Sequence, residues 1–88
     1  MFLSILTEFI GTFVFLTVIL KTNDALAIGL TLAGVIYFGG KVSGGNYNPA
    51  VSYMMYLNKK LDLSKFLLYI FAQIVGASSA LLFHNFTK

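Results

Sequence analysis

The sequence has 88 residues, of which 58% are hydrophobic and only 10% are charged, and its mean hydropathy is +0.85. This composition lies far from that of soluble domains and indicates a chain whose solvent is a lipid bilayer. The absence of cysteine excludes disulfides and thiolate metal sites, and the net charge of +3 comes from scattered lysines, which favours lipid headgroups over nucleic acid as contacts.

Three segments are long and apolar enough to cross a bilayer: residues 2–20, 25–42 and 64–83. At roughly 1.5 Å per residue, each helix would be about 27 to 30 Å long, which matches the hydrocarbon thickness. The first segment has no basic leader and no cleavage site after it, so we interpret it as a retained span. The polar connection "KTND" is short and predicts that the first two helices are antiparallel neighbours. The sequence therefore predicts an all-α membrane protein with residues 1–88 as one unit.

The stretch "SGGNYNPAVS" interrupts this apolar pattern between the second and third spans. Asn48 is a good helix N-cap, and Pro49 suits the first helical position because its missing N–H has no partner there. The apolar run after it predicts a helix of about 10 residues, which is roughly 15 Å long and crosses half a bilayer. We therefore expect a re-entrant loop and half-helix over residues 43–58.

A re-entrant loop carries bare backbone to membrane depth, where it must be buried in protein or line a water-filled cavity. Gly44 and Gly45 permit the sharp turn that such a loop needs. The element thus indicates a pore or a binding site. The alternative is a surface loop followed by an interfacial amphipathic helix, but the run from Ala50 to Leu57 has no charged face.

Four blocks of the chain resemble the aquaporin family, the major intrinsic proteins. "SGGNYNPAVS" looks like the family's first signature loop, with Asn48, Pro49 and Ala50 as its Asn-Pro-Ala box. "TEFIGTF" is similar to the first helix, "AIGLTLAGVIYFGGKVSGGNYNPAV" to the second helix and loop, and "YIFAQIVGA" to the third helix. Family members carry two such repeats in inverted orientation, and this sequence matches one, so it resembles a half-aquaporin.

The resemblance implies a pore that needs a second, inverted half. We expect an antiparallel homodimer, and four such pores side by side is the assembly that the family suggests. Two rows of small residues allow close helix packing; they are Ala25, Gly29 and Ala33, and Ala72, Gly76 and Ala80. Four of the six lysines flank the N-terminal side of the spans, which favours insertion in one orientation and leaves a separately encoded second half open.

The resemblance also assigns roles to individual residues. The box, Asn48, Pro49 and Ala50, would lie at the pore midplane, and the carbonyls of Gly44, Gly45 and Asn46 would line the approach. Glu8 and Gln73 would brace the loop. An alternative for Glu8 is proton coupling, as in small multidrug antiporters with one membrane-embedded glutamate, but that interpretation leaves the box unexplained.

The expected selectivity filter departs from the family pattern. The family's second repeat usually has an arginine after its box, and here that position is Val51. The gapless match places the other filter positions at Ile28 and Ile36, so each constriction would take Ile28 from one subunit and the other two from its partner. Asn46 stands where a histidine is common, and Lys41 places a charge near the mouth.

The predicted function is a passive channel for water and small neutral solutes such as glycerol, in contact with membrane lipids and without a cofactor. An enzyme is not expected, because the chain has no cysteine, a single histidine near its end and no convergent pair of carboxylates. That histidine, His84, and most tyrosines and phenylalanines are interpreted as interfacial or lipid-facing. The alternative function is a non-conducting membrane subunit that pairs with a full-length channel or a separate second half.

Overall fold

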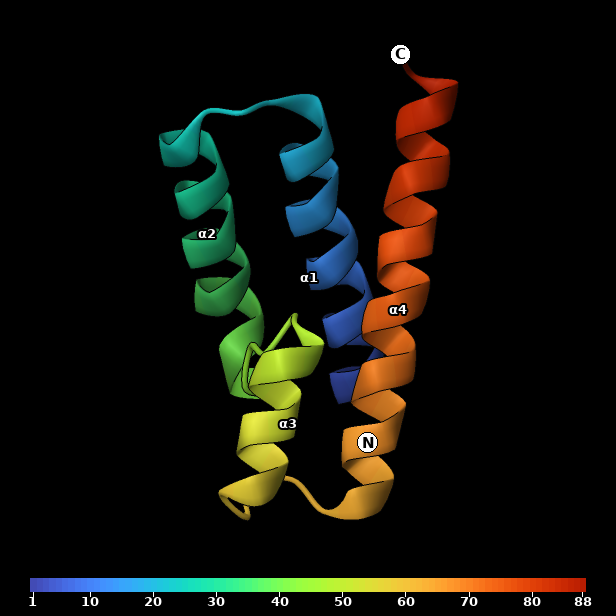
Figure 1. Ribbon diagram of the computed structural model, residues 1–88. Helices are drawn as coiled ribbons and strands as arrows, with labels where there is room; N and C mark the ends of the chain where they lie inside the picture. The colour runs from blue at the N-terminus through green and yellow to red at the C-terminus, as the bar shows by residue number, and fades with distance from the viewer.

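The computed structural model describes all 88 residues, which form four helices and no strand. They are α1 (Phe2–Lys21), α2 (Ala25–Ser43), α3 (Pro49–Leu57) and α4 (Leu63–Phe86). Three of them are long and apolar enough to cross a membrane, and α3 is the short one. The predicted fold class is therefore confirmed. The two chain ends lie at opposite ends of the molecule (Figure 1).

Side-chain caps fix where the later helices begin. The carboxylate of Asp24 accepts a hydrogen bond from the Leu26 backbone N–H at 3.2 Å, and that of Asp62 accepts one from the Lys65 N–H at 2.8 Å. The Asp62 cap starts α4 one residue earlier than the sequence predicted, and α4 continues to Phe86. Its 24 residues give a length of about 36 Å, somewhat more than the hydrocarbon core.

Helix α1 packs against both α2 and α4, and α3 packs against the first half of α4 (Figure 1). Gly76 allows the close approach of α4 to α1, because a Cβ there would lie only 3.0 Å from the Phe9 carbonyl oxygen. The Tyr56 ring of α3 stacks on Phe66 of α4 with 4.9 Å between ring centroids. These contacts hold the short helix beside a long one, with its N-terminus directed into the bundle.

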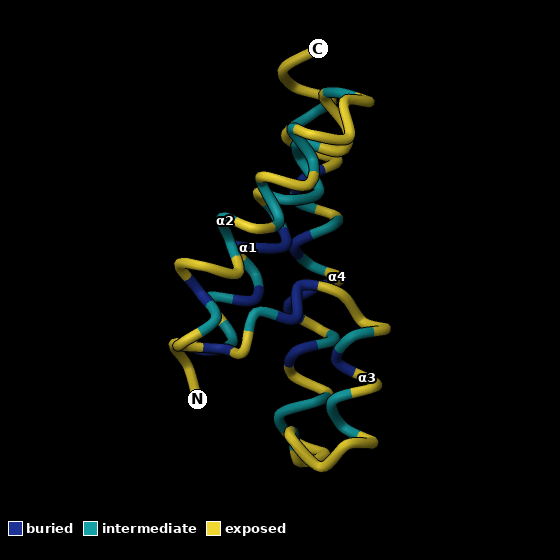
Figure 2. Tube along the Cα trace, turned by 90° about the vertical axis from the view of Figure 1, so that its left-hand side faces the viewer, coloured by how far each residue is buried: buried dark blue, intermediate teal, exposed yellow.

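The interior of the fold is polar and its exterior is apolar. Buried residues of α1, α4 and the loop before α3 gather in one region, and the long helices carry exposed apolar side chains (Figure 2). The buried polar residues are Ser4, Glu8, Thr12, Ser43, Asn46, Ser52 and Gln73. This inverted pattern is expected where lipid replaces water as the solvent, because apolar side chains can then contact the solvent without a free-energy cost.

The two rows of small residues have different surroundings. Ala72, Gly76 and Ala80 are buried within the chain, so this row serves the packing of α4 on α1. The row on α2 is exposed, and a Cβ added at Gly29 would meet nothing within 4 Å. Only the α2 row is therefore free to contact a second chain.

The structure corrects the interpretation of two tyrosines. Tyr37 and Tyr53 are exposed as expected of lipid-facing or interfacial side chains, but Tyr47 and Tyr69 are among the most buried residues, at 2% and 0% exposure. Their hydroxyls donate to backbone carbonyls, Tyr47 to Val35 at 2.6 Å and Tyr69 to Ser43 at 2.5 Å. Their amphipathic rings therefore brace the loop before α3.

Candidate functional site

Glu8 of α1 holds the loop that precedes α3. Its side chain is fully buried, and one carboxylate oxygen accepts hydrogen bonds from the Asn46 backbone N–H at 3.0 Å and the Ser43 hydroxyl at 2.6 Å. The other oxygen accepts from the Tyr47 N–H at 2.7 Å and from the Gln73 amide at 2.9 Å. These four hydrogen bonds offset the free-energy cost of burying the charged carboxylate and the polar backbone groups of the loop.

Gln73 of α4 extends this network to the half-helix. Its amide nitrogen also donates to the Ser52 hydroxyl oxygen at 2.7 Å, and the Asn46 side chain donates to the same oxygen at 3.0 Å. Ser52 lies in the first turn of α3 and is fully buried. One connected set of bonds thus fixes α1, α4, the loop and α3 relative to one another.

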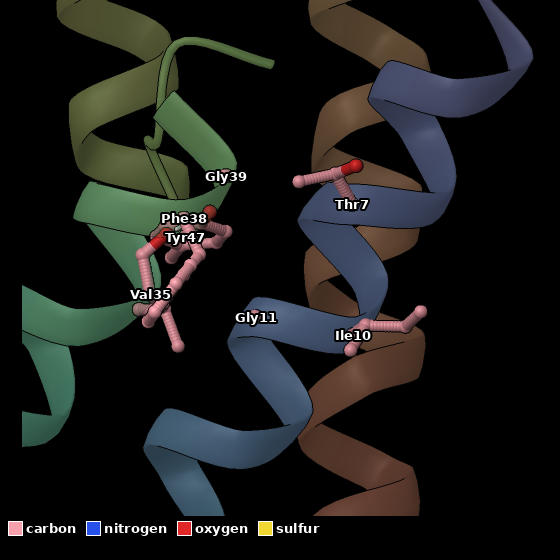
Figure 3. Close-up of a pocket in the computed structure, with 7 residues that line it drawn as sticks. All are labelled: Thr7, Ile10, Gly11, Val35, Phe38, Gly39 and Tyr47. Carbon is pink, nitrogen blue, oxygen red and sulfur yellow. Dashed lines mark hydrogen bonds between the residues drawn. The ribbon is translucent and has the colours of Figure 1, made fainter. Parts of the chain in front are cut away.

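Tyr47 anchors the loop in a niche that two glycines leave open. Gly11 of α1 and Gly39 of α2 face its ring, and a Cβ at either position would overlap the ring or its hydroxyl. Figure 3 shows the hollow at this place between the two helices. Tyr47 has a φ of 54°, which is uncommon for a non-glycine residue, and the packing and hydrogen bonds hold it there.

We expect Gly11→Ala to destabilise the protein by about 1 to 3 kcal/mol, because the added methyl group overpacks the Tyr47 niche. Gly34→Ala is the matched control: it is also helical, and a Cβ there meets nothing within 4 Å. The measurement is the unfolding midpoint in a denaturing-detergent titration. Alanine favours a helix over glycine by about 1 kcal/mol, so the control should be neutral or stabilising. Equal midpoints for the two variants would contradict the niche.

Asn48 caps α3, as predicted, and the box lies open. Its side-chain oxygen accepts a hydrogen bond from the Ala50 N–H at 2.8 Å, and Pro49 occupies the first helical position. This bond uses the carbonyl oxygen of the amide and leaves its two N–H donors free. Asn48, Pro49 and Ala50 are all exposed in the single chain, although they lie where α3 meets the middle of the bundle (Figure 1).

A hollow of about 230 Å³ lies beside the box, and we name it the midplane hollow after the position that the resemblance predicts for the box. Its walls come from α1, α2, the loop and α3: Phe15, Leu32, Ile36, Gly45, Asn46, Tyr47, Asn48 and Val51. Three groups of predicted site residues therefore contribute to one space. Ile36 and Val51 of the proposed filter line it together, and Ile28, half-buried two turns earlier on α2, does not.

A second hollow, of about 250 Å³, lies between the end of α2 and the connection from α3 to α4, and we name it the mouth hollow after the pore mouth that the resemblance predicts. Its walls are formed by Val42, Ser43, Gly44, Asn46, Met55, Lys60, Leu61 and Lys65. Asn46 is the one residue that lines both hollows. Lys41, the charge expected near the mouth, is exposed at the end of α2 and is not a wall residue.

The loop carbonyls are free to act as acceptors. The Ser43 carbonyl accepts the Tyr69 hydroxyl, whereas the carbonyls of Gly44, Gly45 and Asn46 accept no bond from the rest of the chain. Gly44 and Gly45 have φ values of 91° and 67°, a left-handed conformation that glycine adopts without strain. These two residues turn the loop so that its amide groups meet Glu8 and its carbonyls remain available.

A sequence model described as "Major intrinsic protein" matches residues 18–88. The chain belongs to the major intrinsic protein family. The match spans α2, the loop, α3 and α4, and Glu8 lies before its start. Together with three span-length helices, it identifies the chain as a multi-pass integral membrane protein.

Named relatives agree with this family. The chain is 46% identical over 81 residues to the glycerol uptake facilitator protein-like 6 of Lactiplantibacillus plantarum, covering 82% of this chain and 38% of the relative. It is 34% identical to the probable aquaporin PIP-type pTOM75 of Solanum lycopersicum, covering 82% and 31%. It is 40% identical over 53 residues to aquaporin-4 of Mus musculus, covering 60% and 16%. No solved structure matches the chain.

The chain spans about a third of the length of the first two relatives. What it shares with the family is thus one repeat: spans, signature loop and half-helix. Four network residues, Ser43, Tyr47, Ser52 and Tyr69, were not assigned roles from the sequence. Their signal there is weak, because short hydroxyl and aromatic side chains are common in membrane helices.

Proposed function

We propose that the protein is a passive channel for water and small neutral solutes such as glycerol, with its pore formed by an antiparallel homodimer. The observation that carries this proposal is the open Asn48-Pro49-Ala50 box beside the midplane hollow. The family membership and the name of the relative from Lactiplantibacillus plantarum support the solute class.

A second half is needed because α3 is short. Its 9 residues span roughly 13 Å, so the half-helix reaches only about the middle of a bilayer. The exposed box would put polar groups into lipid unless another chain covered it. The exposed small-residue row on α2 offers the surface: by helical periodicity, Gly29 and Ala33 share a face with Ile36, which lines the midplane hollow.

The proposed mechanism places two helix N-termini at the midplane, each equivalent to about half a positive charge. Their field opposes cations. The free amide donors of Asn48 bind the oxygen of a passing water or hydroxyl group, and the carbonyls of Gly44, Gly45 and Asn46 accept its hydrogens on the approach. A water molecule that meets acceptors, then donors, then acceptors must reorient as it passes. This reorientation disfavours a continuous chain of hydrogen-bonded waters along which protons could move.

The proposed filter is apolar. Ile36 and Val51 face the midplane hollow of their own chain, and Ile28 would approach from the partner, which is consistent with its absence from this hollow. No fixed positive charge stands where the family's arginine usually lies. Apolar constrictions favour small uncharged solutes over ions, which carry tightly bound water.

Osmotic shrinkage of liposomes tests the channel. The purified chain should shrink vesicles several-fold faster than empty liposomes do under a sucrose gradient, as followed by light scattering. Under a glycerol gradient in place of sucrose, the shrinkage should be followed by a second phase of re-swelling as glycerol enters. A vesicle population that contains assembled protein and shrinks at the empty rate would contradict the proposal. That result is what the second candidate predicts, a non-conducting subunit that pairs with a full-length channel or a separate second half.

The surroundings of Glu8 favour a bracing role for this residue over proton coupling. Its carboxylate lines neither the midplane hollow nor the mouth hollow, and its four bonds all come from donors of the loop and its supports. A proton carrier needs contact with the permeation path. In the proposed assembly Glu8 and Gln73 therefore hold the loop.

The proposed higher oligomer consists of four homodimers side by side, as the family suggests.

A further inference from the structure

We infer that the mouth hollow is a binding site for the phosphate-bearing headgroup of an anionic phospholipid. Two cationic side chains, Lys60 and Lys65, stand in its wall, and no acidic residue does. The other wall residues include the polar residues Ser43 and Asn46 and apolar ones such as Met55. A phosphodiester joined to a glycerol complements this wall. Its anionic oxygens would meet the two lysines, and its carbon atoms would meet the apolar side chains.

Both lysines are positioned by the fold. Lys60 follows the turn that ends α3, in which its N–H donates to the Met55 carbonyl at 2.9 Å after Lys59 adopts a φ of 62°. This is the hydrogen-bond pattern that closes a helix C-terminus. The Lys65 ammonium lies 5.8 Å from the ring centroid of Tyr69, the buried residue whose hydroxyl bonds Ser43. The aromatic ring holds Lys65 against the wall.

The charge around the hollow is strongly positive. Four of the six lysines belong to the last turn of α2, the connection from α3 to α4 or the first turn of α4, at positions 41, 59, 60 and 65. Two acidic side chains lie nearby, and neither is a wall residue. Asp62 caps α4 through the Lys65 N–H and lines a different hollow with Lys59, and Glu8 accepts hydrogen bonds from the wall residues Ser43 and Asn46. These two carboxylates offset part of the charge of the four lysines from outside the mouth hollow.

A lipid fits the place better than a soluble anion. The hollow lies between the end of α2 and the start of α4. The ends of helices that span a bilayer are expected near the level of the lipid headgroups. Basic residues at this level attract anionic lipids by about 1 kcal/mol each. A volume of about 250 Å³ holds roughly eight waters, enough for a phosphate with its glycerol substituent.

A headgroup in the mouth hollow would also obstruct permeation, because two of its wall residues, Gly44 and Asn46, carry carbonyls that line the approach in the proposed channel. Anionic lipid would thus lower the water flux. Only this consequence rests on the proposed function; the binding itself does not.

The test compares two double variants that remove the same charge. Lys60→Gln with Lys65→Gln changes the wall, and Lys59→Gln with Lys88→Gln changes lysines outside it. Native mass spectrometry in a zwitterionic detergent measures the binding of phosphatidylglycerol and of phosphatidylcholine. We expect the wild type and the control to prefer phosphatidylglycerol, and the wall variant to bind it about 30-fold more weakly.

Equal binding by the two double variants, or equal binding of the two lipids by the wild type, would overturn the site. Binding of inorganic phosphate without phosphatidylglycerol would show a soluble-anion site and overturn the lipid assignment. In liposomes, phosphatidylglycerol should slow water flux through the wild type and the control but not through the wall variant. Preferential binding with no flux in any lipid would retain the site and reject the channel.

Discussion

Replacing Glu8 by glutamine is expected to destabilise the protein by about 2 to 4 kcal/mol and to loosen the loop before α3. The two carboxylate oxygens accept from different backbone groups, the Asn46 N–H and the Tyr47 N–H. A glutamine has one oxygen, so in either orientation its NH₂ group faces one of these donors. A buried donor without a partner costs about 1 to 3 kcal/mol, and the charge-assisted strength of the other bonds is lost as well.

Asp24→Asn is the matched control for Glu8→Gln. It is the same change from acid to amide, but Asp24 is an exposed N-cap, and asparagine caps a helix as well as aspartate does. Denaturing-detergent titration of the three proteins gives the unfolding midpoints. We expect the control to match the wild type and Glu8→Gln to unfold at a clearly lower fraction of denaturing detergent. Stability unchanged in Glu8→Gln would remove the bracing role and return proton coupling as the interpretation of Glu8.

The second large effect is expected from Asn48→Asp, which should lower water permeability and create a cation leak. One aspartate oxygen can replace the amide oxygen that caps α3 at the Ala50 N–H, so the half-helix should remain folded. The other oxygen replaces the amide donors. Loss of a hydrogen bond worth about 1 kcal/mol to a passing water would slow flux roughly fivefold. In the proposed dimer, two ionised carboxylates would more than cancel the positive field of two helix ends, each equivalent to about half a positive charge.

The leak should depend on pH in one direction. Burial at the midplane favours the neutral carboxylic acid. The fraction of the introduced side chains that is ionised, and with it the cation leak, should therefore increase as the pH rises. Asn58→Asp is the control: it adds the same charge at the other end of α3. Water flux by light scattering and potential-driven potassium flux provide the two measurements. If Asn48→Asp assembles and behaves like this control at every pH, Asn48 does not line a pore.

The elements of this fold follow from patterns that the sequence displays openly. The long helices could be predicted because each apolar segment is as long as a bilayer is thick, and α3 because Asn48 and Pro49 start a helix in a distinctive way. The ends of the helices are harder to predict. The start of α4 depends on the hydrogen bond that Asp62 accepts as its cap, and its end at Phe86 lies beyond the length that the hydrocarbon core requires.

The contacts of the loop could be predicted only in outline. A buried glutamate in an apolar helix needs donors, which pointed to Glu8 and the loop, but not to which amide groups serve it. The burial of Tyr47 and Tyr69 could not be predicted, because a tyrosine in a membrane protein most often lies at the interface. The glycines that open the niche for Tyr47, Gly11 and Gly39, come from two different helices, and a single sequence does not show that they face one another.

The central claim is that two copies of this chain meet, in inverted orientation, at their Asn48-Pro49-Ala50 boxes. The chain has no cysteine, so single cysteines report the arrangement directly. Ala50→Cys places a thiol at the box, and Lys88→Cys places one at the C-terminal end, far from the box along the helices (Figure 1). After reconstitution of each variant alone, a short thiol-specific crosslinker should yield a covalent dimer through position 50 and none through position 88. A dimer through position 88, or none through position 50, would contradict the antiparallel pore.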